Sequence, residues 1–278
     1  MNRDQMRRVF SERESNSYRL LNKLGLKRAF YAWYQATRKK SPGLEEFRDL
    51  HKGQRCFILG GGPSLKSIDP APLAGEHTFG VNGLFLIYDW LGFEPTYYAV
   101  EDFLVYEDRF QDIKDFVRDS TCFFPLQFEC PGFNRPSNRY YRGIYEFDED
   151  ANWPEFSEDP TRMLWIGGTV TYICMQLAHY MGFEEVVLLG MDHSYSKPHD
   201  LIVRGNDWTS QSEDPNHFHP DYFGEGYRWH DPRTDRMEKA YAKARAVFER
   251  DGRRIVNATV GGKLESFERV DYDSLFGG

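Results

Sequence analysis

Three glycines stand directly after the first strongly apolar segment of the chain. Residues 56–59 (CFIL) have the character of a buried strand, and they are followed by Gly60, Gly61, Gly62, Pro63 and Ser64. Glycines at a strand end let backbone amides approach a phosphate without a Cβ in the way, and a following helix would direct its positive end at the same anion. The loop has neither the Walker A ending nor the GxGxxG spacing. It predicts a phosphate site, with a tight strand-to-helix turn as the alternative.

Polar side chains follow three further apolar segments, at residues 78–82, 96–100 and 186–190. Open α/β sheets place ligand-binding groups at the carboxyl ends of their strands, so these side chains are candidates for the same site. Asn82 could contact a base or a ribose, or form a simple Asn-Gly turn. Glu101 and Asp102 could hold a metal ion or a sugar hydroxyl, or be ordinary surface acids. After the strongest segment come Asp192, His193 and Tyr195.

Histidines gather toward the C-terminal half of the chain. His217 and His219 precede Asp221 in the run NHFHPDYFG, and His230 lies in YRWHDP. A histidine can take a proton near neutral pH because its pKa is about 6.5, which makes these residues candidates for acid–base chemistry. The His217, His219 and Asp221 cluster could alternatively bind a divalent metal, but the signature is weak. We therefore predict no metal ligands.

Most of these histidines fall within residues 197–233, a polar stretch with little periodicity. A loop of that length inside a compact domain is typically a lid, a binding loop or a disordered linker. Several aromatic residues argue against disorder, so we expect a lid over the active site. They are Trp208, Phe218, Tyr222, Phe223, Tyr227 and Trp229.

The elements that must position these groups alternate between strand-like and helix-like segments. This alternation predicts an α/β fold with a Rossmann-like, mainly parallel sheet and helices on both faces, at residues 51–278. Residues 169–181 have the pattern of a buried helix, which Gly182 should end. Asp231 and Pro232 should open another helix. Its inner face would be Met237, Tyr241, Ala244 and Phe248, with Gly252 at its end before a strand at residues 254–258.

Residues 1–50 form a basic helical extension in this prediction. Residues 1–55 hold 14 Lys and Arg against 6 Asp and Glu, a net of +8, whereas the remaining 21 against 37 give −16. An acidic body repels phosphate, which excludes nucleic acid as a partner of the domain. The apolar spacing within residues 18–37 predicts a helix that either lies on a membrane surface or a partner, or packs on the domain.

The remaining bulk features point to an ordinary intracellular protein. No apolar run approaches the length of a membrane span and the first residues lack a secretion signal, so we expect a cytoplasmic location, with peripheral membrane association through the basic helix as an option. The four cysteines show no CxxC spacing, which indicates neither zinc nor a disulfide framework. Self-association is left open.

Four landmarks occur in a familiar order: ILGGGPSLKSID from residue 58, FGVN ending at Asn82, GGTVTYICMQLAHYMGFEEVVLLGMDHSY at residues 167–195, and YRWHDP at residues 227–232. With these, the sequence resembles the bacterial sialyltransferases of glycosyltransferase family 42. Related domains include Maf-type flagellin glycosyltransferases and archaeal 6-hydroxymethylpterin diphosphokinases. The resemblance covers residues 54–260.

The resemblance implies a sugar transfer, of a nonulosonic acid in the sialyltransferases, from a CMP-linked donor to a glycan or lipid-linked acceptor, without a required metal or cofactor. It implies that His230 deprotonates the acceptor and that Tyr195, with Asp192 nearby, contacts the departing phosphate. The implied nucleotide-binding residues are Gly60, Gly62, Pro63, Ser64 and Asn82. We add Gly61, Glu101, Asp102, Gly168 and Thr169 as candidates for the same site.

The chain departs from that family at two places. Leu164 or Trp165 stands where the sialyltransferases have an arginine, with Arg162 only nearby, and Tyr195 is one residue out of register. Two alternatives therefore stay open. The first is a magnesium-dependent diphosphate transfer from ATP, for which Glu101 and Asp102 loosely resemble the diphosphokinase metal motif. The second is a non-catalytic nucleotide-binding protein or a scaffold whose pocket has decayed.

Overall fold

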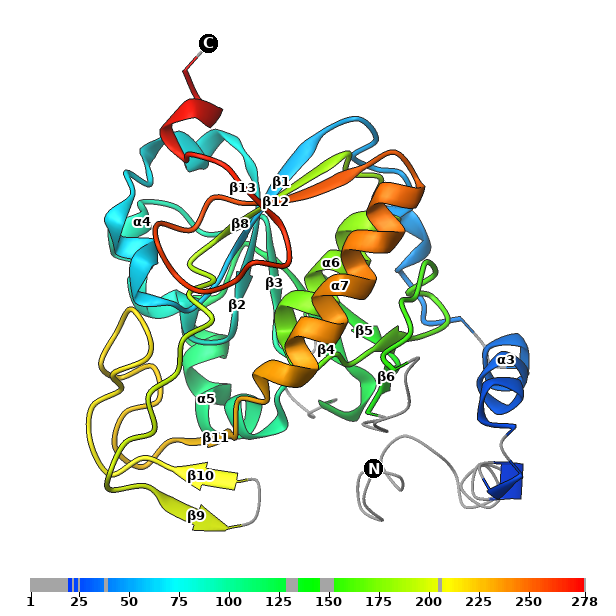
Figure 1. Cartoon of the computed structure of the whole chain (residues 1–278), viewed down its shortest axis with the longest axis horizontal. Coiled ribbons are helices and arrows are strands. Elements are labelled where there is room, and N and C mark those ends of the chain that lie inside the picture. The colour runs from blue at the N-terminus through cyan, green and yellow to red at the C-terminus, as the bar shows by residue number, and fades with distance from the viewer. Residues whose placement is uncertain are drawn as a thin grey trace.

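The centre of the molecule is an eight-stranded sheet with the strand order β13-β12-β8-β1-β2-β3-β4-β5, seen nearly edge-on in Figure 1. The computed structural model describes residues 20–21, 23–24, 26–37, 40–128, 135–145, 153–204 and 207–277. All seven neighbouring pairs in the sheet are parallel, which confirms the predicted mainly parallel fold. The strands are β1 (Arg55–Leu59), β2 (His77–Val81), β3 (Tyr97–Ala99), β4 (Thr121–Pro125), β5 (Asn138–Tyr141), β8 (Glu185–Leu189), β12 (Arg254–Asn257) and β13 (Glu268–Arg269).

The strand order reverses between β1 and β8. From β1 the chain winds outward through β2, β3, β4 and β5, and then returns to place β8 on the other side of β1. Ligand sites of open α/β sheets lie at such a reversal, beyond the carboxyl ends of the strands. The Gly60–Gly62 loop and the Asp192–Tyr195 segment both begin at this reversal, so the sheet brings two predicted site segments together.

Helices cover both faces of the sheet, as predicted. Successive strand residues point to opposite faces, so Cys56 and Ile58 enter one hydrophobic cluster and Phe57 and Leu59 another. On the first face lie α6 (Val170–Tyr180) and α7 (Thr234–Arg250), and on the second α4 (Tyr88–Leu91) and α5 (Phe103–Phe116). Short 3-10 helices occupy Glu45–Phe47, Pro63–Ser67, Ala71–Gly75, Asn82–Ile87, Leu126–Phe128 and Asp273–Leu275, and β6 (Gly143–Ile144) pairs with β7 (Leu164–Trp165).

The helix boundaries agree with the sequence at α6 but not at the start of α7. Thr169 caps α6 by accepting the amide of Thr171, and Gly182 after it has a φ of +87°. The predicted cap of α7 at Asp231 and Pro232 is wrong, because the helix begins at Thr234 without a side-chain cap. Residues Arg228–His230 form strand β11, so the chain is still leaving an extended segment at residue 231.

The loop after β1 is not followed by the expected α-helix. Pro63–Ser67 form only a five-residue 3-10 helix, which begins directly after Gly62. A single short turn has little aligned dipole, because the macrodipole grows from many stacked peptide units. Any anion bound at the glycine loop must therefore be held by individual donors.

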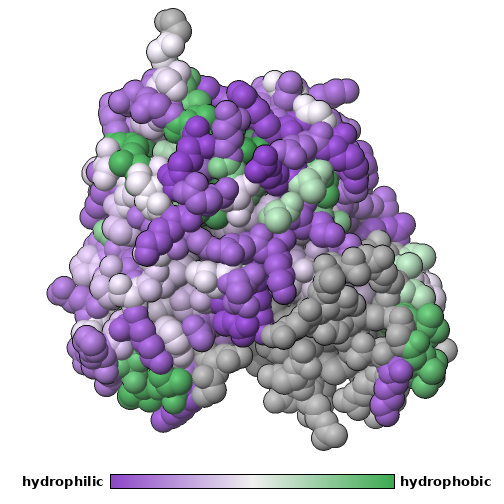
Figure 2. All heavy atoms as spheres, in the orientation of Figure 1, coloured by the Kyte–Doolittle hydropathy of each residue, from purple (hydrophilic) through white to green (hydrophobic). Residues whose placement is uncertain are grey.

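Residues 197–233, called the insert below, contain a three-stranded antiparallel sheet of β9 (Ile202–Arg204), β10 (Asp207–Thr209) and β11. Its described aromatic side chains are largely buried in the same cluster as α5, and Arg109 of α5 donates to the carbonyls of Asp221 and Tyr222. Ile202 and Val203 remain exposed, within the apolar patch that Figure 2 shows near the end of the β9–β10 hairpin. The insert is packed on the domain, and its movement as a lid stays a prediction.

The N-terminal helix α3 (Lys27–Thr37) packs on the domain through its aromatic face. Phe30, Tyr31 and Tyr34 are buried, and the Tyr31 ring lies 4.7 Å from that of Trp165. Trp33 on the other side is 44% exposed. The packed alternative therefore holds for this helix, while residues 1–19, 22, 25, 38 and 39 of the basic extension lie outside the described part of the chain. The predicted domain boundary at residue 51 stays a prediction.

Two further findings concern the described residues only. None of their helices has the length and apolar character needed to cross a membrane. Cys56, Cys122 and Cys174 are buried and unpaired, whereas Cys130 lies outside the described part of the chain.

Candidate functional site

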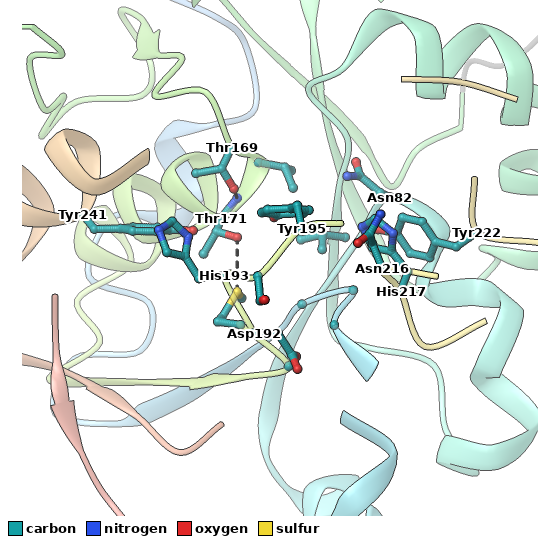
Figure 3. A pocket seen from close by; sticks show the side chains of 18 residues that line it. Asn82, Thr169, Thr171, Asp192, His193, Tyr195, Asn216, His217, Tyr222 and Tyr241 are labelled. Atoms are coloured by element: carbon teal, nitrogen blue, oxygen red, sulfur yellow. Dashed lines mark hydrogen bonds between the residues drawn. The ribbon is translucent and has the colours of Figure 1, made fainter. Parts of the chain in front are cut away.

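A cavity of about 80 Å³ lies at the strand reversal. The loops after β1, β2 and β8 form its floor, the first turn of α6 and Tyr241 of α7 form one wall, and residues 216–222 of the insert form the other, as Figure 3 shows. The predicted residues that line it are Gly60, Gly61, Gly62, Asn82, Thr169, Asp192, His193, Tyr195 and His217. The predicted residues outside its lining are Pro63, Ser64, Glu101, Asp102, Gly168 and His230.

The glycine loop offers fewer free donors than its sequence suggested. The amide of Gly60 donates to Leu189 O at 2.8 Å, and the amide of Gly62 donates to Gly190 O at 2.9 Å. These two amides extend the β1–β8 pairing and are therefore not available to a phosphate. The amide of Gly61 has no hydrogen-bond partner among the described residues, so it is the backbone donor that the loop presents to the cavity.

Close packing explains why this loop contains glycines. A Cβ on Gly62 would lie 1.8 Å from Asp192 Oδ2, and one on Gly60 would lie 2.6 Å from the carbonyl of Gly190. Asp192 in turn accepts a hydrogen bond from Ser64 Oγ at 2.6 Å. Asp192 and Ser64 therefore fasten the loop after β8 to the loop after β1.

Asn82 has an unusual backbone conformation and an unsatisfied side chain. Its φ is +48°, in the left-handed region that asparagine tolerates better than most residues. Its carbonyl accepts from Tyr98, and its side chain bonds the hydroxyl of Tyr222. Its Oδ1 is buried and has no partner among the described residues. An unpaired buried oxygen costs about 1–3 kcal/mol, so a donor on a bound molecule would find a prepared acceptor here.

Three tyrosines give the cavity neutral hydrogen-bonding groups. Burial raises the pKa of Tyr222 and of Tyr241 above the usual value of 10.0. Tyr195 is 38% exposed, and partial desolvation, with the nearby Tyr241, Tyr222 and the carboxylates of Asp192 and Asp214, raises its pKa. All three hydroxyls therefore keep their protons at neutral pH, and Tyr195 stands between the two walls in Figure 3.

The cavity contains little positive charge. Among the described residues that line it there is no lysine or arginine, and the groups that can become cationic are His193 and His217. His193 Nε2 lies 3.2 Å from Glu238 Oε1, which would offset its charge. A site of this kind suits one phosphate group better than a polyphosphate, because each additional negative charge that is removed from water needs a positive charge or a hydrogen-bond donor in the site to offset the lost hydration.

A second group of predicted residues meets beyond the cavity lining, at the end of β3. His230 Nδ1 lies 2.8 Å from Asp102 Oδ2, and His230 Nε2 lies 3.4 Å from Asp207 Oδ1. Asp102 Oδ1 accepts the amide of Leu104 at 2.8 Å and caps α5. The predicted nucleotide-binding role of Glu101 and Asp102 finds no support in the cavity lining, because Asp102 is held by the helix and by His230.

Charge and burial tune both acids and bases of this group. Burial lowers the pKa of His230, but the hydrogen bond to Asp102 and the charges of Asp102, Asp207 and Glu101 outweigh it and raise the pKa above 6.5. Burial and the charge of Asp102 raise the pKa of Glu101 to about 8, against an opposing effect of His230. His230 is therefore a strengthened base.

Strand order relates the two groups. The ends of β1, β2 and β3 are neighbours on one edge of the sheet, and adjacent strands lie about 4.8 Å apart. Two strand spacings of about 4.8 Å place the Asp102–His230 pair about 10 Å from the glycine loop along that edge. That separation is on the scale of a nucleotide-linked sugar.

The histidines of the predicted cluster have separate partners in the structure. His217 Nδ1 faces Asp214 at 2.7 Å, whereas His219 Nδ1 accepts the amide of Asp221 within its own loop. The two rings thus serve different partners, and the described residues contain no group of three His, Cys, Asp or Glu side chains arranged to hold a metal.

Several lining residues were not predicted from the sequence. They are Thr171, Asn216, Tyr222 and Tyr241. Thr171 follows the predicted Thr169 in the same small-residue segment, and Asn216 and Tyr222 flank the predicted histidines. Asn216 is held by Ser196, whose amide donates to Asn216 Oδ1 at 2.6 Å. No local pattern distinguishes Tyr241 from the other buried residues of its helix.

Comparisons with known proteins identify the fold. No protein-family model and no curated protein sequence matches the chain. Among solved structures, the chain is similar to the Maf glycosyltransferase from Magnetospirillum magneticum AMB-1, with a TM-score of 0.51 and 17% sequence identity. The match covers 88% of this chain but only 38% of that one. The chain therefore has the Rossmann-like α/β fold found in part of a Maf glycosyltransferase.

Proposed function

We propose that this protein is a glycosyltransferase that moves a sugar from a CMP-linked donor to a hydroxyl of a glycan or lipid-linked acceptor. The observation that carries the proposal is the Asp102–His230 pair, which stands on the same sheet edge as a cavity with an unpaired amide at Gly61. The similarity of the fold to a Maf glycosyltransferase agrees with this class of reaction. A nonulosonic acid as the sugar rests on the sequence resemblance to the sialyltransferases.

The cavity supports a donor with a single phosphate. The Gly61 amide, the hydroxyl of Tyr195 and the Asn82 oxygen provide two donors and an acceptor without a lysine or arginine beside them. The cavity of about 80 Å³ is much smaller than the roughly 300–1,000 Å³ of typical ligand pockets. Donor binding therefore requires the cavity to widen.

The reaction needs one proton acceptor and one group that stabilises the leaving phosphate. The carboxylate of Asp102 accepts from Nδ1–H of His230, which leaves Nε2 to take the proton of the acceptor hydroxyl. The acceptor oxygen bonds the anomeric carbon of the sugar as the bond from that carbon to the phosphate oxygen breaks. The phosphate oxygen keeps the electron pair, and the donors of the cavity stabilise the charge that develops.

Ligand-induced stabilisation tests the proposal directly. A ligand present at 100 times its Kd stabilises the native state by about 2.7 kcal/mol. We expect CMP, with or without Mg²⁺, to raise the melting temperature of the full chain, and a CMP-sugar to be consumed in the presence of a glycan acceptor. Stabilisation by ATP only with Mg²⁺ would instead support the diphosphokinase alternative. No stabilisation by any common nucleotide would support a scaffold.

A further inference from the structure

A second histidine–carboxylate pair is built into the insert beside the cavity. His217 Nδ1 lies 2.7 Å from Asp214 Oδ2, and the side chain of Asp214 is only 2% exposed. The same carboxylate accepts the amides of Asn216 at 2.8 Å and Phe223 at 2.9 Å. Because a carboxylate with this surrounding accepts but does not donate, the His217 ring donates its Nδ1–H to Asp214.

The His217 ring is fixed in orientation at the cavity wall. It stacks on Tyr222 with a centroid distance of 4.1 Å and an angle of 1° between the planes, and Phe223 meets it edge-on. Figure 3 shows His217 and Tyr222 together with Asn82 and Asn216, across Tyr195 from His193 and Tyr241. Because the ring is already fixed in the free protein, it can hold Nε2 in one direction without a further loss of side-chain entropy when a ligand binds.

The exposed edge of this ring faces the glycine loop. A Cβ built on Gly61 would lie 2.7 Å from His217 Cδ2, the carbon bonded to Nε2. The carbonyl of Gly61 accepts the amide of Phe218 at 2.9 Å, which ties the histidine segment to the loop. His217 Nε2 has no hydrogen-bond partner among the described residues, as is true of the Gly61 amide.

We propose that His217 is a catalytic residue that, together with the amide of Gly61, binds the phosphate of the donor and stabilises it as the sugar departs. As the bond from the anomeric carbon to the phosphate oxygen breaks, the electron pair stays on that oxygen, which accepts a hydrogen bond from Nε2–H of His217. The acceptor proton goes to His230, so the two histidines act on opposite sides of the sugar. This inference rests on the proposed function and requires the ring to carry a proton on each nitrogen, Nδ1–H for Asp214 and Nε2–H for the phosphate.

Titration calorimetry with CMP and with cytidine separates a phosphate contact from a structural role. A hydrogen bond to a charged group is worth about 1.5–3 kcal/mol, which corresponds to about 10- to 100-fold in affinity. We expect His217→Ala to weaken CMP binding by about that factor and to leave cytidine binding unchanged. His217→Gln, which keeps a side-chain N–H, should recover part of the affinity for CMP.

His219→Ala is the matched control, because His219 lies two residues away and bonds only its own loop. It should bind both ligands as the unmodified protein does. Equal losses for CMP and cytidine in the His217 variants would assign the ring a packing role and overturn the inference. So would unchanged CMP binding. If His217→Ala does not fold, His217→Gln carries the same comparison.

The ligand binding of the unmodified protein shows whether the proposed function itself fails. In that case the unmodified protein binds neither CMP nor cytidine, and the inference about His217 is overturned with it. If the unmodified protein binds CMP but the His217 variants show no difference between CMP and cytidine, the inference about His217 is wrong and the proposed function still stands.

Discussion

The two histidine–carboxylate pairs of the insert differ in how they are assembled. The His217 and Asp214 side chains are 11% and 2% exposed, whereas those of His230 and Asp102 are 43% and 18% exposed. Asp214 is three residues from its histidine, but Asp102 belongs to the sheet body, and 128 positions separate it from His230. The first pair is therefore complete within the insert, and the second exists only while the insert is docked on the end of β3.

This difference suits the two pairs to different tasks. His230 stands among Asp102, Asp207 and Glu101, which together raise its pKa against the effect of partial desolvation, and its 43% exposed side chain leaves room for an acceptor hydroxyl. His217 is flat against Tyr222 and has its remaining nitrogen beside Gly61. An exposed pair that forms on docking fits a base that meets an incoming acceptor, and an enclosed pair fits a donor that meets a bound phosphate.

The largest expected effect of a substitution in either pair is at His230. General-base catalysis is worth about 10²–10⁴-fold in rate, so we expect His230→Ala to lower kcat by that factor and to leave the Kd for CMP nearly unchanged. Steady-state kinetics and calorimetry provide the two measurements. His199→Ala, which removes an exposed histidine of the same insert, should keep full activity. Retained activity in His230→Ala would remove this residue from the mechanism.

A smaller effect is expected from a substitution at Gly61, where the loop after β1 contacts the His217 ring. The added Cβ of Gly61→Ala would lie 2.7 Å from His217 and 3.0 Å from Tyr222, and such overpacking typically costs about 1–3 kcal/mol. We expect a lower free energy of unfolding in urea and weaker CMP binding. Gly75→Ala is the control, because nothing lies within 4 Å of its added Cβ. Equal stability of the two variants would show that the insert does not press on the loop.

The sheet could be predicted from sequence because its strands are short apolar runs whose ends are marked by glycine or polar residues. β1, β2, β3 and β8 were placed within one or two residues. β13 (Glu268–Arg269) has two exposed residues and no apolar pattern, so nothing in its composition indicates a strand. β4 (Thr121–Pro125) is apolar and buried but was not singled out.

The site was harder to predict, because its geometry depends on contacts between distant segments. The glycine loop was placed correctly, but the pairing of the Gly60 and Gly62 amides with the end of β8 requires the strand order, which sequence does not give. The pairing of Asp102 with His230 likewise requires the position of the insert. Asp214 carries no signal apart from its spacing of three residues from His217.

Removal of the charge within the enclosed pair should have a moderate effect on stability. Asp214→Asn replaces a buried acceptor of three hydrogen bonds, and the loss of one charge-assisted hydrogen bond costs about 1.5–3 kcal/mol. We expect urea unfolding to show a decrease of about that size. Asp207→Asn, at a side chain that is 55% exposed, should leave the free energy of unfolding nearly unchanged. A reversed order would contradict the distinction between an enclosed and an exposed pair.

The smallest effect is a displacement of the pH dependence by Asp102→Asn. The base must be neutral, so kcat/KM of the unmodified protein should rise with pH through a pKa above 6.5, the ordinary value that Asp102 raises. Asparagine can still cap α5 but lacks the charge, so the rise should move to lower pH. The raised folded pKa also means that the pair stabilises the protein below pH 6.5 and loses that contribution as pH rises through the folded pKa. Asp102→Asn should therefore lower the melting temperature more at pH 5.5 than at pH 8.5, and the opposite order would show that His230 is not the group that titrates.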